Sequence, residues 1–508
     1  MIVRINLMRL DKYHVLLIVI LCSCGLLSAL MPQSVFTPSI HSMMHSSLLS
    51  QNPNYISQPE LTRAEGLSHP FKSPEVFVDH LTTALGLADH DLNLLSYRHQ
   101  SSAFEADISV IAGYEHNFTD DTDYRFWYKG WDFFARAGER LSMYSLWYNG
   151  AYYGDLDAAE SDELIDGYFK RFNRRIQLDN MNGYIQYETD SYSLALGRGR
   201  FQIAPSISGS IILSDNVNDY GYFLAEGRAG AFSLSFLHGS LKADSTYSIY
   251  DNNILNNRNY PDKFIALHQL NYRPNPNWDF YVGESVVYGN RSIDLGYLLP
   301  NSFWRAVEHN LWDRDNVLIY AGLQHRCARN ITLYAQLALD EFSYSKIFSN
   351  WWGNKYALQG GIDHRHKAGS ITLELSAVRP YTYAHFQNHS MYSHDGQPLG
   401  YRHGSNVLNL SLQNHLQIMP CLEWNMQAGF SYRGSEGTSW QDNYHEIFEG
   451  VIDEAEVKWF AGEINREYSI SNSLNIPLTR SHTLLAGHQG KYLDEWQHRV
   501  FAAWQFRL

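Results

Sequence analysis

The chain has 508 residues and a formal net charge of -14, and 14% of its residues are aromatic. The acidic excess disfavours a nucleic-acid partner, because binding the phosphate backbone needs clustered Lys and Arg side chains. After Met31 no apolar run is long enough for a membrane helix. A high aromatic content without such runs is typical of an outer-membrane β-barrel, whereas composition alone leaves a soluble all-β protein open.

Residues 1–30 are predicted to be a secretory signal peptide. Basic side chains precede the apolar run VLLIVILCSCGLLSAL at 15–30, which is the layout of such a signal. LCSC at 21–24 loosely resembles a lipobox, in which Cys24 would be the acylated residue.

Residues 31–102 are predicted to form a small helical segment on the periplasmic side. Ser57 and Ser73 are typical helix caps, and Pro74 fits the first turn of the second helix. We expect this segment to pack on the domain C-terminal to it and to have no catalytic role.

Residues 103–508 are predicted to form one all-β domain, a transmembrane antiparallel β-barrel. In ITLYAQLALD at 331–340 and ITLELSA at 371–377, apolar and polar residues alternate, so each strand has one apolar and one polar face. In a barrel that spans a membrane, the apolar face contacts lipid and the polar face lines the lumen.

Connections between the predicted strands are either tight or long. The tight ones lie at 273–277, 327–330, 366–369, 418–421 and 478–481, and the long, aromatic and polar ones at 290–316, 341–355, 380–404 and 436–454. This asymmetry is the outer-membrane pattern, with short turns toward the periplasm and long loops toward the outside.

The expected strands number about 18, an even number as in single-chain bacterial barrels, so both ends of the barrel are expected in the periplasm. They are placed at 103–113, 127–136, 141–153, 180–188, 191–198, 221–228, 231–240, 262–272, 278–288, 316–326, 331–340, 356–365, 370–379, 405–416, 422–434, 458–476, 482–490 and 497–508. Cys327 and Cys421 then lie in different hairpins, beyond disulfide reach, and are expected to be free thiols.

Several segments of the barrel resemble the capsule assembly Wzi family of outer-membrane proteins. They are ALGRGRFQIAPSISGSIILSDN at 195–216, DNVLIYAGLQ at 315–324, LALDEFSYSKIF at 337–348, WWGNKYALQGGIDH at 351–364, VRPYTYAH at 378–385 and DGQPLGYRHGSN at 395–406. The resemblance implies a barrel of about 18 strands with a periplasmic helical bundle, a lumen occluded by loops, and lectin-like retention of capsular polysaccharide. A Trp-Gly-Pro-Gly type turn that the family often has is reduced here to Pro205, so the plug loop is expected to differ in shape.

The loop after residue 199 contains small residues at 206 and 208–210, which suit a segment packed inside the lumen. Together with the resemblance, this predicts a closed pore. The candidate plug residues are Arg198, Arg200, Pro205, Ser208 and Gly209.

Aromatic residues among polar ones in the long loops suggest a carbohydrate site, because flat rings pack on sugar faces while polar groups bind hydroxyls. The candidate residues are Arg379, Tyr381, Tyr383, His385, Tyr392, Tyr401, Trp304 and Trp440. Arg379 would offer a planar fork to the carboxylate of an acidic sugar, with the first two tyrosines in the same patch. Alternatively, Arg379 only neutralises a lumen carboxylate such as Glu374 or Asp340.

Catalytic and metal-binding interpretations are weaker. HFQNHSMYSHDG at 385–396 brings His, Ser and Asp together in sequence, but proximity in a loop is not a triad. His364 and His366 lie near a short turn and are expected to be surface histidines, and Asp340 and Glu341 point to opposite faces of one strand. We therefore expect no enzyme activity, no cofactor and no metal.

The sequence thus predicts an outer-membrane β-barrel that binds or anchors a surface polysaccharide without covalent chemistry. The expected partners are that polysaccharide and outer-membrane lipid, and a monomer is expected. The alternative is a porin or substrate-specific outer-membrane channel, which the same wall pattern would support.

Overall fold

The computed structural model describes residues 95–99, 104–160, 162, 169–243, 246–247, 258–259, 261–312, 314–346, 349–419, 422–479 and 481–507. The predicted signal peptide, Cys421 and most of the predicted helical segment lie outside these ranges. The end of that segment contains a strand, β1 (Leu95–His99). None of the helices within the described ranges is long and apolar enough to cross a membrane.

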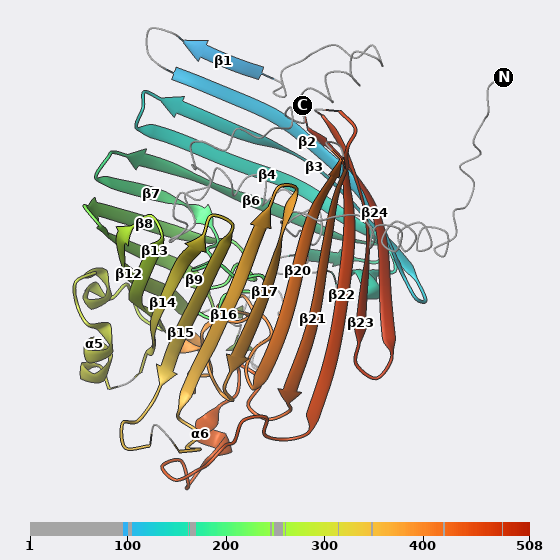
Figure 1. Ribbon diagram of the computed structural model, residues 1–508. Helices are drawn as coiled ribbons and strands as arrows, with labels where there is room; N and C mark the ends of the chain where they lie inside the picture. Colours follow the sequence, from blue (N-terminus) through green and yellow to red (C-terminus); the bar gives the residue numbers. More distant parts are fainter. Residues whose placement is uncertain are drawn as a thin grey trace, which may run out of the picture.

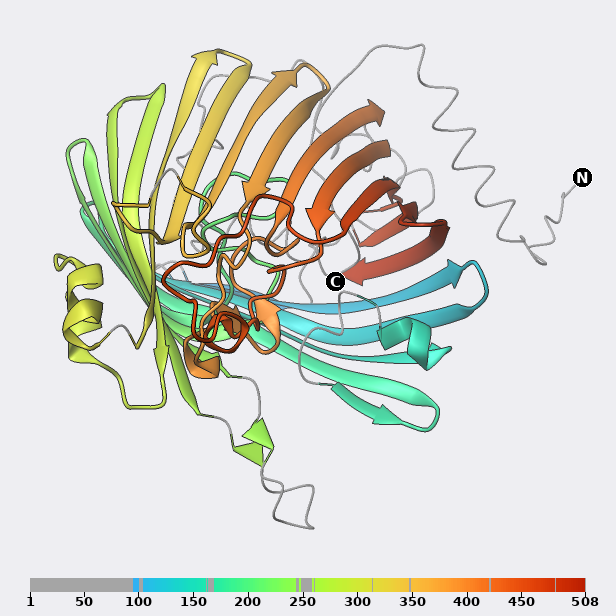
Figure 2. The same cartoon turned by 90° about the horizontal axis from the view of Figure 1, so that it is seen from below.

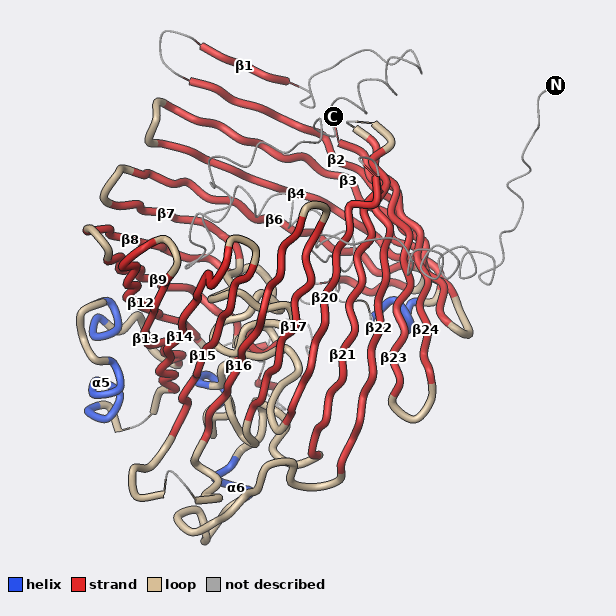
Figure 3. Tube along the Cα trace, viewed as in Figure 1, coloured by secondary structure: helices blue, strands red, loops and turns tan. Residues whose placement is uncertain are grey.

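Antiparallel strands close into a single 18-stranded barrel (Figures 1 and 3). In order around the wall they are β2 (Phe104–Thr119), β3 (Asp123–Ala137), β4 (Leu141–Gly154), β6 (Arg175–Glu188), β7 (Tyr192–Gly199), β8 (Tyr220–Ala229), β9 (Phe232–Lys242), β12 (Asp262–Asn275), β13 (Trp278–Gly289), β14 (Asn316–Ala328), β15 (Ile331–Glu341), β16 (Lys355–His366), β17 (Gly369–Val378), β20 (Val407–Met419), β21 (Leu422–Gly434), β22 (Ile464–Pro477), β23 (His482–Tyr492) and β24 (Trp496–Arg507). The last strand pairs with the first, from Ile111 opposite Arg507 to Thr119 opposite Arg499. The predicted all-β barrel is confirmed.

The alternation seen in the sequence separates the two faces of the wall. On β17, Thr372, Glu374 and Ser376 are buried and face the lumen, whereas Leu373 and Leu375 are 43% and 49% exposed on the outside. The same holds around the barrel, where exposed apolar residues of the outer face include Leu194, Leu196, Phe223, Leu270, Val282, Leu333, Leu358, Ile362 and Leu410. Such an outer band is what a lipid environment requires.

Exposed rings gather on the outer face near the short turns. Phe232 and Tyr272 stack at 4.7 Å, Tyr272 lies 6.4 Å from Phe280, and Tyr187 lies 6.2 Å from Tyr192. Rings at one level on neighbouring strands form an aromatic girdle of the kind found at membrane interfaces.

The two ends of the barrel differ as predicted. Short turns join the strands at one end, where the described ends of β2 and β24 also lie (Figure 3). The remaining elements lie in connections at the other end: α4 (Leu156–Glu160), β5 (Phe169–Phe172), β10 (Thr246–Tyr247), β11 (Arg258–Asn259), η2 (Leu295–Leu298), α5 (Trp304–Asn310), η3 (Asn388–Ser390), β18 (Ser393–His394), β19 (Gln397–Pro398) and α6 (Tyr444–Ile447).

Four strand boundaries differ from the prediction by four residues or more, and one of them is the start of β6, at Arg175 instead of 180. The first barrel strand extends to Thr119 and the second begins at Asp123, because a tight turn in which the Thr119 N–H donates to the Thr122 carbonyl replaces the longer expected connection. The strand expected from 458 begins at Ile464, since the preceding residues pack with the neighbouring loops. Cys327, which lies near the turn between β14 and β15, is a free and exposed thiol, as predicted.

Candidate functional site

Two loops fill the lumen toward the loop end, and we call them together the plug. One joins β7 to β8 (residues 200–219) and the other joins β17 to β20 (residues 379–406); Figure 2 shows both inside the ring of strands. Their apolar residues are fully buried and pack against inward-facing side chains of the wall; they include Ile203, Ile211, Ile212, Leu213, Val217 and Leu399. Inside this end of the barrel there is therefore a hydrophobic core.

A carboxylate of the wall holds the first plug loop. Glu374 on β17 accepts hydrogen bonds from the backbone N–H groups of Ile207 (3.1 Å) and Ser208 (3.0 Å). It also accepts from the hydroxyls of Ser206 (3.2 Å), Ser208 and Tyr334 (2.6 Å). Consecutive backbone N–H groups form a concave site for an anion, so the loop is shaped around this side chain.

Neighbouring polar side chains extend this attachment. The Gln359 side-chain amide donates to the Gly209 carbonyl at 3.0 Å and to the Ser376 hydroxyl at 2.8 Å. Gly209 has a φ of 92°, a conformation that favours glycine. The Tyr401 hydroxyl, from the second plug loop, donates to Ser208 at 3.1 Å.

The two plug loops also bind each other. The Tyr383 hydroxyl donates to the Ile211 carbonyl at 2.7 Å, and the Tyr392 hydroxyl donates to the Ile212 carbonyl at 2.9 Å. The Ser214 N–H donates to the Leu399 carbonyl at 2.7 Å. Because each buried hydroxyl has an acceptor on the other loop, the loops stabilise one another as a unit.

Four of the five predicted plug residues lie in the plug. Ser208 and Gly209 are buried, Pro205 is half-buried, and the Arg200 guanidinium donates to the Val217 carbonyl at 2.9 Å. Arg198 is an exception: it is still on β7 and is exposed on the outer face, where its Nε donates to the Met181 carbonyl at 3.2 Å. The prediction was wrong for this residue because the chain leaves the wall only after Gly199, and strand alternation turns Arg198 outward.

The predicted sugar-binding residues are mostly inaccessible. Arg379, Tyr381, Tyr383, His385, Tyr392, Tyr401 and Trp304 are all buried, and Trp440 is half-buried against the lumen core. As a surface for a polysaccharide this set is wrong, because the long loops fold onto one another and use their aromatic residues as core. An aromatic residue among polar ones in a loop does not by itself indicate exposure.

The expected Arg379–Tyr381–Tyr383 patch does not form. The Arg379 guanidinium donates to the Val457 carbonyl at 2.9 Å and lies over the rings of Tyr356 and Trp459, and burial lowers the pKa of Arg379. Tyr381 contacts other loops, whereas Tyr383 points into the plug. The partner of the Arg379 guanidinium is thus a backbone carbonyl, and neither the carboxylate of a sugar nor one of the expected lumen carboxylates.

Three loop segments form what we call the roof, at the loop end of the barrel: residues 342–346 with 349–354, residues 379–386 at the start of the second plug loop, and residues 435–463. Trp352 and Tyr444 are buried at its centre, with their rings 4.6 Å apart. The buried ammonium of Lys355 lies 4.2 Å from the Tyr444 ring and pairs with Glu341 at 2.9 Å. This packing positions the remaining aromatic side chains of the roof.

The outer surface of the roof combines partly exposed rings with acidic side chains. Phe386, half-buried, lies 4.4 Å from the exposed His445 ring, and Trp351 and Phe448 are also half-buried. The exposed carboxylates on the 435–463 loop are Glu436, Glu446, Glu449, Asp453, Glu454, Glu456 and Glu463. The surface is therefore aromatic and negatively charged.

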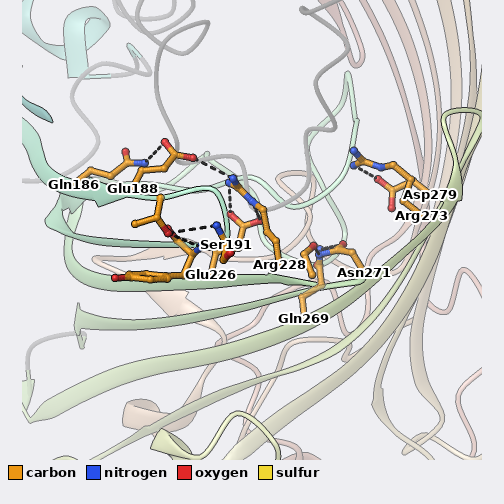
Figure 4. A network of polar contacts seen from close by, with 12 residues as sticks. Gln186, Glu188, Ser191, Glu226, Arg228, Gln269, Asn271, Arg273 and Asp279 are labelled. Carbon is orange, nitrogen blue, oxygen red and sulfur yellow. Dashed lines mark hydrogen bonds and ion pairs between the residues drawn. The ribbon is translucent and has the colours of Figure 1, made fainter. Parts of the chain in front are cut away.

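At the other end the lumen is polar, and we call this part the vestibule (Figure 4). Arg228 pairs with Glu188 at 3.1 Å and Glu226 at 3.3 Å, and Arg273 pairs with Asp279 at 3.0 Å. These side chains continue the inward-facing positions of β6, β8, β12 and β13, and all but Asp279 are partly or largely exposed. Among the described residues, the charged lining of the lumen is therefore open toward the side of the short turns.

The groups considered for catalysis bind other partners. Within 385–396, all of which the structure describes, the Ser390 hydroxyl donates to the Arg314 carbonyl, and the His394 ring accepts from the Lys242 N–H. Asp395 pairs with Lys242. His364, on a strand near its turn, lies 2.9 Å from the Asn330 amide. No nucleophile–base pair is formed among these loop residues.

No family model and no curated protein matches the sequence. Among solved structures, the chain is similar to Wzi, a carbohydrate-binding outer-membrane β-barrel involved in group 1 capsule assembly in Escherichia coli, with 14% identity and a TM-score of 0.49 over 79% of this chain and 84% of that one. It is also similar to Pseudomonas aeruginosa OpdK, solved with vanillate (10%, 0.46, 79% and 98%), and to OprD of the same organism (9%, 0.44, 82% and 98%). Similarities at this level do not distinguish a polysaccharide-binding barrel from a channel.

Proposed function

We propose that this chain is an outer-membrane barrel that is closed by its plug and retains a surface polysaccharide at its roof, without covalent chemistry. The observation that carries the proposal is the plug, whose two loops bind each other and the Glu374 carboxylate of the wall. A barrel closed in this way is suited to display a surface rather than to conduct solutes. The resemblance of several barrel segments to the capsule assembly Wzi family supports a polysaccharide as the ligand. Short turns would face the periplasm together with both termini.

The roof suggests the class of polysaccharide. Phe386 and His445 offer neighbouring ring faces, which suit the apolar face of a sugar. The carboxylates around them repel a polyanion at moderate ionic strength. We therefore propose a polysaccharide of low negative charge, neutral or rich in amino sugars, in place of the acidic sugar expected from Arg379.

Binding of the refolded protein to a glycan array tests this proposal. Neutral and amino-sugar polysaccharides should bind more strongly than uronic-acid polymers. Phe386→Ala combined with His445→Ala should lower binding several-fold, whereas Tyr344→Ala, which removes an exposed ring of the roof beside Phe342, should not. Equal binding by both variants would place the ligand elsewhere, and absence of binding to every glycan would argue against the proposal.

A channel is the second candidate, and the vestibule favours it. Exposed charged pairs such as Arg228–Glu188 line a hydrated lumen below the plug, which a protein with only a display role does not need. If the plug moves, the vestibule provides a polar path. Planar-bilayer recording separates the candidates: large, steady conductance of the unmodified protein would favour the channel.

A further inference from the structure

The connection between β13 and β14 lies against the outside of the barrel. We call its residues 290–312, which include η2 and α5, the lobe; Figure 2 shows α5 outside the ring of strands. Trp304 of the lobe packs with Phe236, Ala266, Val286 and Val317. These positions alternate with the residues of the same strands that pack on the plug, so the lobe covers the lipid-facing side of the wall.

Beneath the lobe is a polar pair on the outer face of the wall. The Glu284 carboxylate is 4% exposed and accepts hydrogen bonds from the N–H groups of Trp304 (2.8 Å) and Arg305 (3.1 Å). Its Oε2 lies 3.2 Å from His268 Nε2, and the His268 ring lies 4.1 Å from the Trp304 ring. The start of α5 is therefore attached to a side chain that points away from the lumen.

The pair lies deep in the membrane-spanning part of the wall. Glu284 is six residues from Trp278, the turn-side end of β13. At a rise of about 3.3 Å per residue and a tilt of about 40°, this is about 15 Å along the membrane normal, near the middle of the apolar band. A carboxylate facing hydrocarbon at that depth is costly, so the pair requires a cover within the membrane.

The outer surface of the lobe carries large apolar side chains. Trp312 is 92% exposed, Leu295 75% and Phe303 60%, and Ile293 and Leu299 are about half exposed. Asn290, Ser292, Asn301, His309 and Asn310 are exposed as well. The arginine and carboxylate groups are instead paired and at least half-buried: Arg291 pairs with Asp315 at 2.7 Å, to which Tyr297 also donates at 2.8 Å, and Arg305 pairs with the buried Glu308. Charged groups inside and apolar groups outside are the arrangement expected of a surface in contact with lipid rather than water.

We propose that the lobe is embedded in the outer leaflet, where Leu295, Leu299 and Phe303 contact lipid acyl chains and shield the His268–Glu284 pair. The occupant is lipid because the apolar surface continues the outer band of the same strands, at Leu270 and Val282. Trp312 then lies nearer the headgroups, the level at which tryptophan is enriched.

Fluorescence quenching tests this proposal. In a background whose four cysteines are replaced by Ser, Leu295→Cys and, separately, Phe303→Cys carry an environment-sensitive label in phosphatidylcholine vesicles. Lipids with nitroxides on their acyl chains should quench both labels several-fold more than aqueous iodide does. The matched control is Tyr344→Cys, an exposed aromatic position on another loop, where iodide should be the stronger quencher.

Two results would overturn the proposal. One is iodide quenching at 295 and 303 as strong as at 344, which would place the lobe in water. The other is efficient disulfide formation between Leu295→Cys chains without acyl-chain quenching, which would make the lobe an interface between two copies. A second variant, Glu284→Gln, leaves the lobe's apolar surface unchanged and should retain the quenching pattern.

Discussion

Two carboxylates on opposite faces of the wall perform the same physical task. Glu374 points inward and binds the N–H groups of Ile207 and Ser208, and Glu284 points outward and binds those of Trp304 and Arg305. In each case a loop folds back and satisfies a charge that the strand places in a non-aqueous environment. Single side chains thus determine where two long loops attach.

The effect of a new charge on the folding free energy should depend on whether the side chain on β17 points toward lipid or toward the lumen. Leu373→Arg places a cation in the lipid and should cost on the order of 2–4 kcal/mol of folding free energy if the position is near the midplane. Thr372→Arg should cost less, because this residue faces the lumen and its hydroxyl lies 3.0 Å from the Asp363 carboxylate, which can pair with the new cation. Urea titration of both variants in vesicles measures the difference, and equal costs would contradict the assignment of the two faces.

Among the elements, the plug depends on contacts between loops that are distant in sequence. Ser208 meets Glu374 across 166 residues, and Tyr383 meets Ile211 across 172. Because the loops share these contacts, weakening one attachment should loosen both.

Removing the wall carboxylate should open the lumen. Glu374→Leu leaves the N–H groups of Ile207 and Ser208 without their acceptor, and unsatisfied buried donors cost about 1–3 kcal/mol each. We expect ion conductance in planar bilayers where the unmodified protein has little. Asp363→Asn, which removes a carboxylate from the next strand without touching the plug, is the control; a closed Glu374→Leu barrel would mean that other contacts hold the plug.

Acid should loosen the second plug loop. Burial lowers the pKa of His394 from 6.5 to about 4, and burial together with the Lys355 cation lowers the pKa of His385 well below its usual value. A released loop takes up protons at these histidines below pH 6.5 while the packed loop does not, so the packing free energy is fully present above pH 6.5 and falls as the pH decreases toward 4.

Protease sensitivity of the 379–406 loop against pH measures this effect. Cleavage should increase between pH 6.5 and 4. His394→Gln, which keeps an acceptor for the Lys242 N–H, should flatten the profile. A profile that is the same in both proteins would show that this histidine does not control the loop.

For the molecule as a whole, the barrel closes through a buried ion network at the seam between β24 and β2. Arg499 donates to Glu115 (3.1 Å), Asn117 (2.7 Å) and Asp162 (2.8 Å), and Tyr124 also donates to Asp162 (3.0 Å). One side chain therefore joins the last strand, the first strand and the connection between β4 and β6.

Arg499→Met should destabilise the closed barrel by about 3–5 kcal/mol, because Glu115 and Asp162 are left buried without their cation. The expected readout is a lower thermal midpoint of the barrel in detergent. Arg125→Met on β3 is the matched control: both side chains of its pair with Asp123 are about half exposed, so its effect should be small. Equal midpoints for the two variants would mean that the seam network does not stabilise closure.

The wall could be predicted from the amino-acid sequence alone: the number of strands, their faces and the unequal lengths of turns and loops. These features depend on alternation along strands such as β17 and on short turn segments, which are local properties of the backbone. Four of the five plug residues were also predictable, since small residues in a long loop and the family resemblance both indicated packing inside the lumen.

Only the tertiary structure showed which side chains of the long loops are buried and what they pack against. Tyr381, Tyr383 and Trp304 each lie among polar residues in the sequence, as the residues of an exposed sugar site would. In the structure Tyr381 packs in the roof, Tyr383 in the plug and Trp304 against the outer face of the wall. A loop has no internal period that marks a buried face. The exposure of its side chains depends on whether the loop folds into the lumen, over the rim or along the outside of the barrel. Contacts with residues more than a hundred positions away in the sequence, such as that of Tyr383 with Ile211, determine which of these the loop does.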